Sequence, residues 1–270
     1  MGDILTPMSA PLPISVCLIS GPDAGRIGLA LESIRGWTAE IIVIVNDDVS
    51  DGTDKLAEQY GAKVFREPWK EHIAQKNSAA AKATQPWILG LDSDEEISPK
   101  LKDSITRFFL SAQAGRPDAL RMHRCSLFLG RWIRHGDWYP DWQTRLWRAG
   151  RAKWGGIDPH DRLEVTGPIG TLAGDILHYS NPSISSYVSK INYFSDLYLK
   201  SRLKKGSRWS PAEAAFRAFW RFFRAYFIRL GFLDGFPGFY IAASTFYSTL
   251  VRHTRLLEHN LSRRPIPPKP

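Results

Sequence analysis

The sequence is poor in cysteine, and its acidic residues are fewer than its basic ones. Only two cysteines occur among the 270 residues, Cys17 and Cys125, and their separation fits no metal-binding or redox motif. A disulfide framework is therefore excluded as the basis of the fold, and a reducing cytoplasm is the expected compartment. Cys17 lies within an apolar run, where a cysteine packs as a small hydrophobic side chain.

The start of the chain, MGDILTPMSAPLPISV, lacks the basic region and long apolar core of a signal peptide. Acidic residues number 27 against 36 lysines and arginines, which gives a net charge of +9. Such a surface favours nucleic acid, phosphorylated substrates or an acidic membrane as partner, although simple solubility would explain it equally well. Hydrophobic residues make up 43% of the chain, so we expect one large folded domain, alone or with an appendage.

Short apolar runs alternate with helical patterns through the first hundred residues. We predict strands at Ile14–Ser20, Glu40–Val45, Ala62–Phe65 and Trp87–Leu91, and helices at Ala24–Arg35, Thr53–Tyr60 and Ile73–Thr84. Alternation of this kind predicts an α/β fold with a mostly parallel sheet and right-handed crossovers. Ligands bind beyond the carboxyl ends of such strands, so the loops at 45–53 and 92–96 should line one crevice.

The rest of the chain changes character twice. Residues 118–178 carry aromatic and charged side chains in short runs, which indicates mixed strands and functional loops. Ser183–Leu203 is an amphipathic helix by its apolar spacing, and Pro211 suits the first turn of another helix. Arginines alternate with aromatic residues over 209–251, a composition typical of a helix lying in a membrane interface, although a helical subdomain packed on its own core would share it. Phe236–Val251 is too short for a full membrane span.

Four acids follow directly on the fourth predicted strand, in the stretch WILGLDSDEEIS. Asp92 and Asp94 stand on alternate residues, so in an extended segment both carboxylates would point to one side and face one Mg²⁺ or Mn²⁺ ion. Asp47 follows the second strand and is suited to accept hydrogen bonds from a nucleobase or ribose, whereas Thr53 is expected to cap the next helix. Lys76, near a helix start, suits a diphosphate or is an ordinary solvated charge.

These stretches together resemble the inverting family 2 glycosyltransferases of the GT-A fold. The likeness to their nucleotide-sugar half lies in EIIVIVNDDVSDGT and QKNSAAAKATQPWILGLDSDEEISPKL. The likeness to their later part lies in FLGRWIRHGDWYPDWQTRLWRAGRAKW, DPHDRLEVTGPIGTLAGDILHYS and RLGFLDGFPGFYIA. The likeness covers roughly residues 14–255 and is nearest to the WaaE-like glucosyltransferases of the lipopolysaccharide inner core. Each piece is a weak signal, but the combination is specific.

The resemblance implies a UDP-sugar donor, a divalent cation and inversion at the anomeric carbon. Carried over residue by residue, Asp92 and Asp94 resemble the metal and diphosphate ligands, Asp47 a uridine contact, and Lys76 and Asn77 donor-site residues. The implied acceptor is a lipid-linked saccharide, and the implied location is peripheral, on the inner face of the inner membrane. The basic aromatic helices would then meet an anionic membrane surface.

Inversion needs one base that removes the proton of the acceptor hydroxyl. The subgroup carries a histidine followed by an acid after its aromatic block, and here that pair is His160-Asp161, with Asp where Glu is usual. Asp161 is the first candidate for the base, Asp141 the second and Asp137 a third. His160 would act as the base, orient the acid or serve a structural purpose only.

Gln143 and Arg145 are expected to hold the departing diphosphate or the acceptor, with Arg145 suited to bidentate bonds with phosphate. The chain departs from the family at the nucleoside end, where Asn46 stands in place of the usual Asp, Asp48-Val49 in place of Gly-Ser, and Pro22-Asp23 in place of Asn-Glu. These departures leave the identity of the nucleotide open.

By domain, we expect a flexible N-terminus at 1–13, a catalytic domain at 14–182, a helical, membrane-associated region at 183–258 and a disordered tail at 259–270. The catalytic domain would divide into a nucleotide-sugar half at 14–98 and an acceptor half at 99–182. Three alternatives stay open: an acceptor from capsule or exopolysaccharide, a nucleotidyltransferase, and a non-catalytic nucleotide- or nucleic-acid-binding protein. Nucleic acid is not expected as a partner, because paired carboxylates would repel its phosphates, and a nucleotidyltransferase would usually carry a Gly-rich phosphate loop that SGPDAGRIG does not match.

Overall fold

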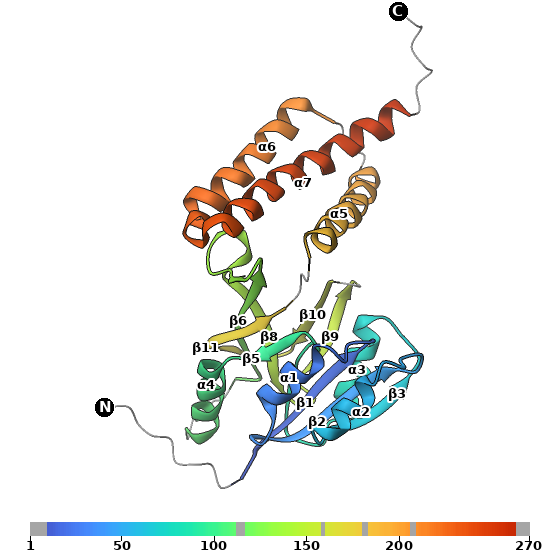
Figure 1. Ribbon diagram of the computed structural model, residues 1–270, viewed down its shortest axis with the longest axis vertical. Helices are drawn as coiled ribbons and strands as arrows, with labels where there is room; N and C mark the ends of the chain where they lie inside the picture. Colours follow the sequence, from blue (N-terminus) through green and yellow to red (C-terminus); the bar gives the residue numbers. More distant parts are fainter. Residues whose placement is uncertain (1–9, 112–116, 158–159, 180–182, 206–208, 263–270) are drawn as a thin grey trace, which may run out of the picture. The chain divides into compact units, whose positions relative to one another are not determined.

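The computed structural model describes residues 10–111, 117–157, 160–179, 183–205 and 209–262 (Figure 1). The chain separates into two compact units, here called the sheet unit, Met1–Arg124 with Asp141–His178, and the helical unit, Cys125–Pro140 with Tyr179–Pro270. Residues 125–140 therefore group with the C-terminal helices. The expected flexible N-terminus and disordered tail fall largely on 1–9 and 263–270, which lie outside the described residues.

The sheet unit is built on a mixed sheet with helices packed against it. Its strands are β1 (Leu12–Ser20), β2 (Thr38–Asn46), β3 (Lys63–Glu67), β4 (Trp87–Gly90), β5 (Glu95–Ile97), β6 (Ala119–Phe128, which continues into the helical unit), β8 (Asp141–Arg148), β9 (Ala152–Ile157), β10 (His160–Val165) and β11 (Ile169–His178). Its helices are α1 (Ile27–Ile34), α2 (Thr53–Gln59), α3 (His72–Ala81) and α4 (Pro99–Leu110). The large sheet has the order β3-β2-β1-β4-β8-β6-β11-β5, while β9 and β10 form a separate antiparallel pair.

Strands β1 to β4 pair in parallel, which confirms the α/β prediction for the first half of the sheet. The sheet is then completed by antiparallel pairings of β8 with β4 and with β6, and of β11 with β5. Strands β1 and β2 are buried on both faces, as their continuous apolar runs require. Cys17 is central in β1, and its thiol approaches the carbonyl oxygen of Ala79 at 3.5 Å. Burial raises the pKa of this thiol to about 12, so Cys17 is a packing residue.

The helical unit contains β7 (Arg131–Trp132), η1 (Gly136–Trp138), α5 (Ile184–Lys204), α6 (Pro211–Phe223), η2 (Arg224–Ile228), η3 (Gly231–Asp234) and α7 (Gly235–Leu261). Helices α6 and α7 lie side by side (orange and red in Figure 1). The Ser210 hydroxyl accepts a hydrogen bond from the Glu213 amide at 3.3 Å, and Pro211 occupies the first turn, which confirms the predicted helix start. Among the described helices, none is both long enough and apolar enough to cross a bilayer.

Candidate active site

Polar side chains gather where β1, β2 and β4 end. Asp23 follows β1, Asp47 follows β2 and Asp92 follows β4, so the parallel pairing brings their loops to one edge of the sheet. The Asp23 carboxylate accepts hydrogen bonds from Ser93 Oγ at 2.6 Å and from Arg26 Nε at 2.7 Å. The first and fourth strand-end loops are therefore joined directly through side chains.

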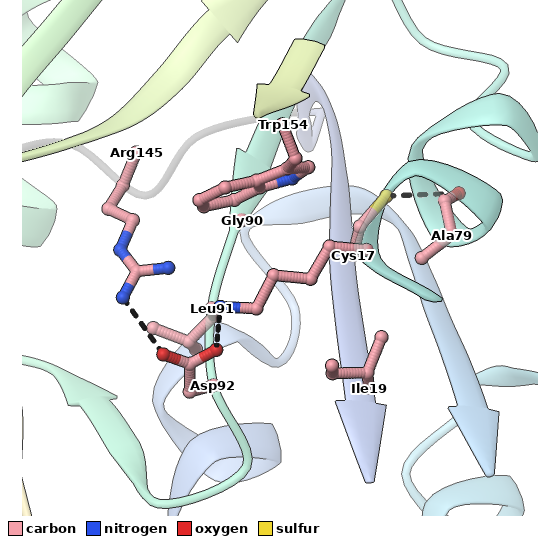
Figure 2. Close-up of a pocket in the computed structure, with 9 residues that line it drawn as sticks. Cys17, Ile19, Ala79, Gly90, Leu91, Asp92, Arg145 and Trp154 are labelled. Atoms are coloured by element: carbon pink, nitrogen blue, oxygen red, sulfur yellow. Dashed lines mark hydrogen bonds and ion pairs between the residues drawn. The ribbon is translucent and has the colours of Figure 1, made fainter. Parts of the chain in front are cut away.

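Asp92 is held by two cations from elements distant in the sequence. Lys76 Nζ of α3 lies 2.7 Å from one carboxylate oxygen, and Arg145 Nη2 of β8 lies 2.8 Å from the other. Figure 2 shows the Arg145 side chain reaching down to Asp92 beside the indole of Trp154. Burial alone would raise the pKa of Asp92, but Arg145 and Lys76 outweigh it and hold that pKa well below its ordinary value. The charge of this strand end is thus balanced first by the protein itself.

Lys76 also connects the strand end to the β9–β10 hairpin. Its ammonium group lies 2.8 Å from an oxygen of Asp161 and 4.7 Å from the ring centroid of Trp154. The Lys76 side chain is only 9% exposed, so it is fixed between two carboxylates and an aromatic face. Two of the predicted residues, Asp92 and Asp161, are therefore brought together through a third.

Asp94 has looser partners than Asp92. His178 Nε2 lies 3.6 Å and Arg26 Nη1 4.0 Å from its carboxylate. Burial raises the pKa of Asp94, but the interaction with His178 outweighs it, and the net effect is a lowered pKa. Ser93 and Asp94 form a turn, so the expectation of an extended Asp-Ser-Asp segment is wrong: β4 ends at Gly90, and the chain reverses to enter β5. The two carboxylates consequently have separate sets of partners.

Asp141 and Gln143 lie at the start of β8. Arg124 Nε donates to Asp141 at 2.9 Å, and Gln143 Nε2 donates to the same carboxylate at 2.8 Å. Arg124 also lies 3.4 Å from Glu95, which is fully buried and contacts Arg145 at 3.2 Å. Glu95 therefore links the Asp141 group to the Asp92 group.

The other predicted residues have different environments. Asp47 is exposed, with its backbone amide bonded to Glu67. The Asn77 amide donates to and accepts from the Trp154 backbone, at 2.9 Å each, and so anchors the β9–β10 hairpin. His160 begins β10, but its side chain lies outside the described residues. Asp137 belongs to the helical unit, where Arg224 Nη2 lies 2.7 Å from its carboxylate.

Asp51 and Thr53 fix the loop after β2. The Asp51 carboxylate accepts hydrogen bonds from the Thr53 amide at 3.1 Å, the Thr53 hydroxyl at 2.6 Å and the Ala24 amide at 3.0 Å. The Thr53 hydroxyl in turn accepts from the Asp23 amide at 2.9 Å. Thr53 is the first residue of α2, and the position before it is Gly52 with φ +90°. The Thr53 side chain therefore does not cap α2, so that expectation is wrong, and the Asp51 carboxylate accepts from the Thr53 amide instead.

Glu95, Trp154 and His178 complete the site, and the sequence interpretation assigned none of them a function. Glu95 belongs to the acidic run DSDEE, and its position just after a buried strand was the sequence feature that could have identified it as a site residue. Trp154 packs against Gly90, where a Cβ atom would lie 2.7 Å from the indole. His178 is the last residue of β11, and only the pairing of β11 with β5 brings it near Asp94.

A divalent cation fits Asp94 better than Asp92. Two cations closely hold the oxygens of Asp92, whereas the partners of Asp94 lie at 3.6 Å or more. Across the described part of the chain, no group of three or more His, Cys, Asp or Glu residues is arranged to hold a metal ion. The protein would therefore supply few ligands, and water and substrate phosphate oxygens would supply the others, as Mg²⁺ and Mn²⁺ allow.

Comparison with known proteins gives concordant matches. The family model for glycosyl transferase family 2 matches residues 24–163. An uncharacterized glycosyltransferase of Rickettsia prowazekii (strain Madrid E) is 30% identical, over 92% of this chain and 88% of its own. The lipopolysaccharide core biosynthesis glycosyltransferase LpsC of Rhizobium meliloti (strain 1021) is 26% identical, over 96% of this chain and 97% of its own. The crystal structure of S. aureus TarS 1-349 in complex with UDP-GlcNAc superimposes with a TM-score of 0.48 at 16% identity, over 88% of this chain and 81% of that one.

The family match covers more than half of the chain, and the Rickettsia relative matches over nearly all of it. The match includes α3 and β8, which carry Lys76 and Arg145, and the loops after β2 and β4, which carry Asp47 and Asp92. The parallel strands with acidic loops at their carboxyl ends fit the GT-A fold. This chain is a glycosyltransferase and belongs to glycosyl transferase family 2.

Proposed function

We propose that this enzyme transfers a hexose from a UDP-sugar to a lipid-linked saccharide of the lipopolysaccharide inner core, with inversion at the anomeric carbon. The hexose we propose is glucose, and the donor is then UDP-glucose. The similarity to LpsC over nearly the full length of both chains supports the pathway. The resemblance to the WaaE-like enzymes supports the sugar. The acceptor class agrees with the net charge of +9, because saccharides of this kind are anionic.

One observation carries the donor half of this proposal, namely the unused donors of Arg145. Its Nη2 contacts Asp92 and Glu95, but its Nε and Nη1 are buried and have no hydrogen-bond partner in the described part of the chain. Buried guanidinium nitrogens without acceptors are costly, and phosphate oxygens are the acceptors that suit a guanidinium best. A donor diphosphate beside Asp92 and Asp94 would supply them.

The nucleoside end has a matching unsatisfied acceptor. Asn46 Oδ1 is buried and accepts no hydrogen bond from the described residues. It is the last residue of β2, beside Asp47, at the carboxyl edge of the sheet. A pyrimidine ring N–H would satisfy Asn46, and the Asp47 carboxylate would accept from the ribose hydroxyls.

The chemical step needs one carboxylate that takes the acceptor proton and cations that stabilise the leaving diphosphate. We assign the role of this base to Asp161 first and to Asp141 second. The acceptor oxygen attacks the anomeric carbon as its proton passes to the carboxylate, and the bond to the β-phosphate oxygen breaks on the opposite face. Lys76 and Arg145 offset the charge that develops on the diphosphate. A divalent ion, when bound, would add its charge at Asp94.

The donor assignment is tested by isothermal titration of the purified protein with UDP, GDP and TDP, with and without Mn²⁺. We expect UDP to bind best and to need the metal. Asp94→Asn should weaken metal-dependent UDP binding at least tenfold, whereas Asp103→Asn on α4, which also removes one carboxylate, should not. Equal binding by both variants would remove Asp94 from the metal site.

The base assignment is tested separately by transfer assays at saturating UDP-glucose. Asp161→Asn should keep UDP affinity within about twofold but lower turnover by about 10²- to 10⁴-fold, the range of general base catalysis. Asp141→Asn is the matched variant. If it loses turnover while Asp161→Asn stays active, the base is Asp141. Saccharide acceptors from lipopolysaccharide core and from capsule, assayed side by side, distinguish the two acceptor classes.

We also propose that the enzyme works at the inner face of the inner membrane as a peripheral protein. Helix α6 exposes Phe216, Phe219 and Trp220, and Phe236 is exposed at the start of α7. Arginines accompany these rings along α6 and η2. Exposed aromatic side chains interleaved with cations fit the headgroup region of an anionic bilayer.

A further inference from the structure

The helical unit contains a cavity of about 370 Å³ that belongs entirely to that unit. Residues 187, 190, 191 and 194 of α5 line it, as do residues 245, 248 and 252 of α7, each set at the spacing of one helix face. Asp137 and Trp138 of η1 and Arg221 of α6 complete the lining. Cavities of this size hold small ligands, and nothing in the transfer reaction as described uses this one.

Positive charge exceeds negative charge in the lining. The cations are Lys190, Arg221 and Arg252, and the single carboxylate is Asp137. Asp137 is already shared, because Arg224, Arg229 and Arg221 lie 2.7, 3.4 and 3.9 Å from its oxygens. The carboxylate is thus committed to a group of arginines and leaves a net positive charge in the cavity.

Arg252 is the cation with least compensation. Its Nε is buried without a hydrogen-bond partner, and no acid among the described residues forms an ion pair with it. Burial and the nearby charge of Arg221 lower the pKa of Arg252. Two guanidinium groups facing one cavity repel each other unless an anion lies between them, and a fork of N–H donors suits a phosphate or carboxylate.

The remaining walls suit a sugar ring. Trp138 and Tyr187 offer aromatic faces, with ring centroids 5.6 Å apart, and Phe194 adds a third. The hydroxyls of Thr245 and Ser248 donate within α7, to Ile241 O at 2.8 Å and Thr245 O at 3.1 Å, so their lone pairs stay available as acceptors. Aromatic faces with hydroxyl acceptors can bind the C–H face and the hydroxyls of a saccharide.

We propose that this cavity is a second binding site, one that takes an anionic sugar: a saccharide unit bearing a phosphate or carboxylate group. The anion would lie between Arg221 and Arg252, and the ring against Trp138 and Tyr187. A neutral sugar would leave Arg252 uncompensated, because among the described residues only Arg221 has an acid beside it, Asp137 at 3.9 Å. The site goes beyond the proposed transfer reaction, since none of its residues belongs to the Asp92 cluster.

The test uses the full-length protein and isothermal titration with glucose 6-phosphate and glucuronic acid, beside glucose and inorganic phosphate. We expect both anionic sugars to bind more tightly than either comparison ligand. Arg252→Gln should weaken their binding at least tenfold. Arg252→Lys keeps the charge but loses the paired N–H donors, so its affinity should lie between those of the wild-type protein and Arg252→Gln. The matched control is Arg217→Gln, because Arg217 on α6 is exposed and pairs with Glu213 outside the cavity.

A second experiment distinguishes two possible sources of the bound anion, a saccharide and a lipid headgroup. Pelleting with phosphatidylglycerol vesicles, repeated with added glucose 6-phosphate, asks whether the cavity holds a lipid phosphate. If glucose 6-phosphate reduces vesicle pelleting of the wild-type protein but not of Arg252→Gln, the cavity binds lipid headgroups. If glucose 6-phosphate does not change pelleting, the cavity binds saccharides. Glucose 6-phosphate and glucuronic acid that fail to bind, or that bind Arg252→Gln and Arg217→Gln equally, would overturn the proposal. Thermal unfolding of Arg252→Gln checks folding, which we expect to be preserved because the removed charge is uncompensated.

Discussion

At the scale of single residues, Asp92 and Asp94 differ in what they do for the folded protein. Asp92 compensates Lys76 and Arg145, whose side chains are 9% and 4% exposed. Asp92→Asn should therefore destabilise the protein by about 2 to 3 kcal/mol, less than a fully buried pair would cost, because the aspartate is 25% exposed. Asp94→Asn should cost less than about 1 kcal/mol. Urea unfolding of both variants is the measurement, and equal losses would contradict the division of roles.

Gly90 makes room for the tryptophan that covers the site. A Cβ atom there would lie 2.7 Å from Trp154 and 3.3 Å from Trp147. Gly90→Ala should displace Trp154, which lies against both Lys76 and Arg145, and destabilise the protein by about 1 to 3 kcal/mol. UDP binding should weaken with it.

The control for this substitution is Gly25→Ala, because a Cβ atom at Gly25 would meet nothing within 4 Å. Denaturant unfolding and UDP titration of the two variants provide the comparison. A Gly90→Ala protein as stable as Gly25→Ala would mean that Trp154 is not held in place by this contact.

At the scale of secondary-structure elements, Glu40 joins several parts of the sheet unit. Its carboxylate accepts hydrogen bonds from Ser15 of β1, from Lys63 of β3 at 2.7 Å and from the Thr84 amide at 2.9 Å. Burial raises its pKa, but these bonds outweigh it and lower the pKa from 4.5 to about 2. The carboxylate therefore stabilises the fold above about pH 4.5, and this contribution is lost as the pH falls through about 2.

Glu40→Gln should accordingly lower the free energy of unfolding by about 2 to 3 kcal/mol at pH 7. The difference from the wild-type protein should shrink steadily below pH 4.5, because the wild-type carboxylate then loses its advantage. Urea unfolding at several pH values between 7 and 3 measures it. Glu32→Gln, at an exposed acid of α1, is the control, and a pH-independent difference at Glu40 would refute the linkage.

At the scale of the whole molecule, a net charge of +9 and the exposed aromatic residues of α6 and α7 predict membrane association. The double variant Phe219→Ser/Phe236→Ser should weaken pelleting with phosphatidylglycerol vesicles about tenfold or more, at roughly 25 cal/mol per Å² of apolar surface. Leu110→Ser removes an exposed apolar side chain from α4 and should have no effect. Pelleting should weaken with salt and with neutral lipid. Equal pelleting by both variants would argue against an interface at these rings.

The strands and helices of residues 14–91 and the C-terminal helices were accessible from the sequence alone, whereas β5 and α4 were not predicted and the strands of residues 118–178 were not placed individually. Predicted strands at Ile14–Ser20 and Glu40–Val45 correspond to β1 and β2, and the predicted helix at Ser183–Leu203 corresponds to α5. Strands buried on both faces need continuous apolar runs, and helices need apolar residues at a period of 3.6, so these elements leave a local record. The strand-end acids were predictable for the same reason, because each follows directly on its strand.

Only the tertiary structure decided which charges meet. Arg145 reaches Asp92 across 53 residues of sequence, and Lys76 reaches Asp161 across 85. No local pattern records such pairs, because they depend on β8 pairing with β4 and on where α3 packs. The assignment of residues 125–140, which include Asp137, to the helical unit has the same origin. Sequence fixes what each segment can form, whereas the partners of a buried charge are fixed by long-range packing, which alone brings distant segments within ion-pair distance.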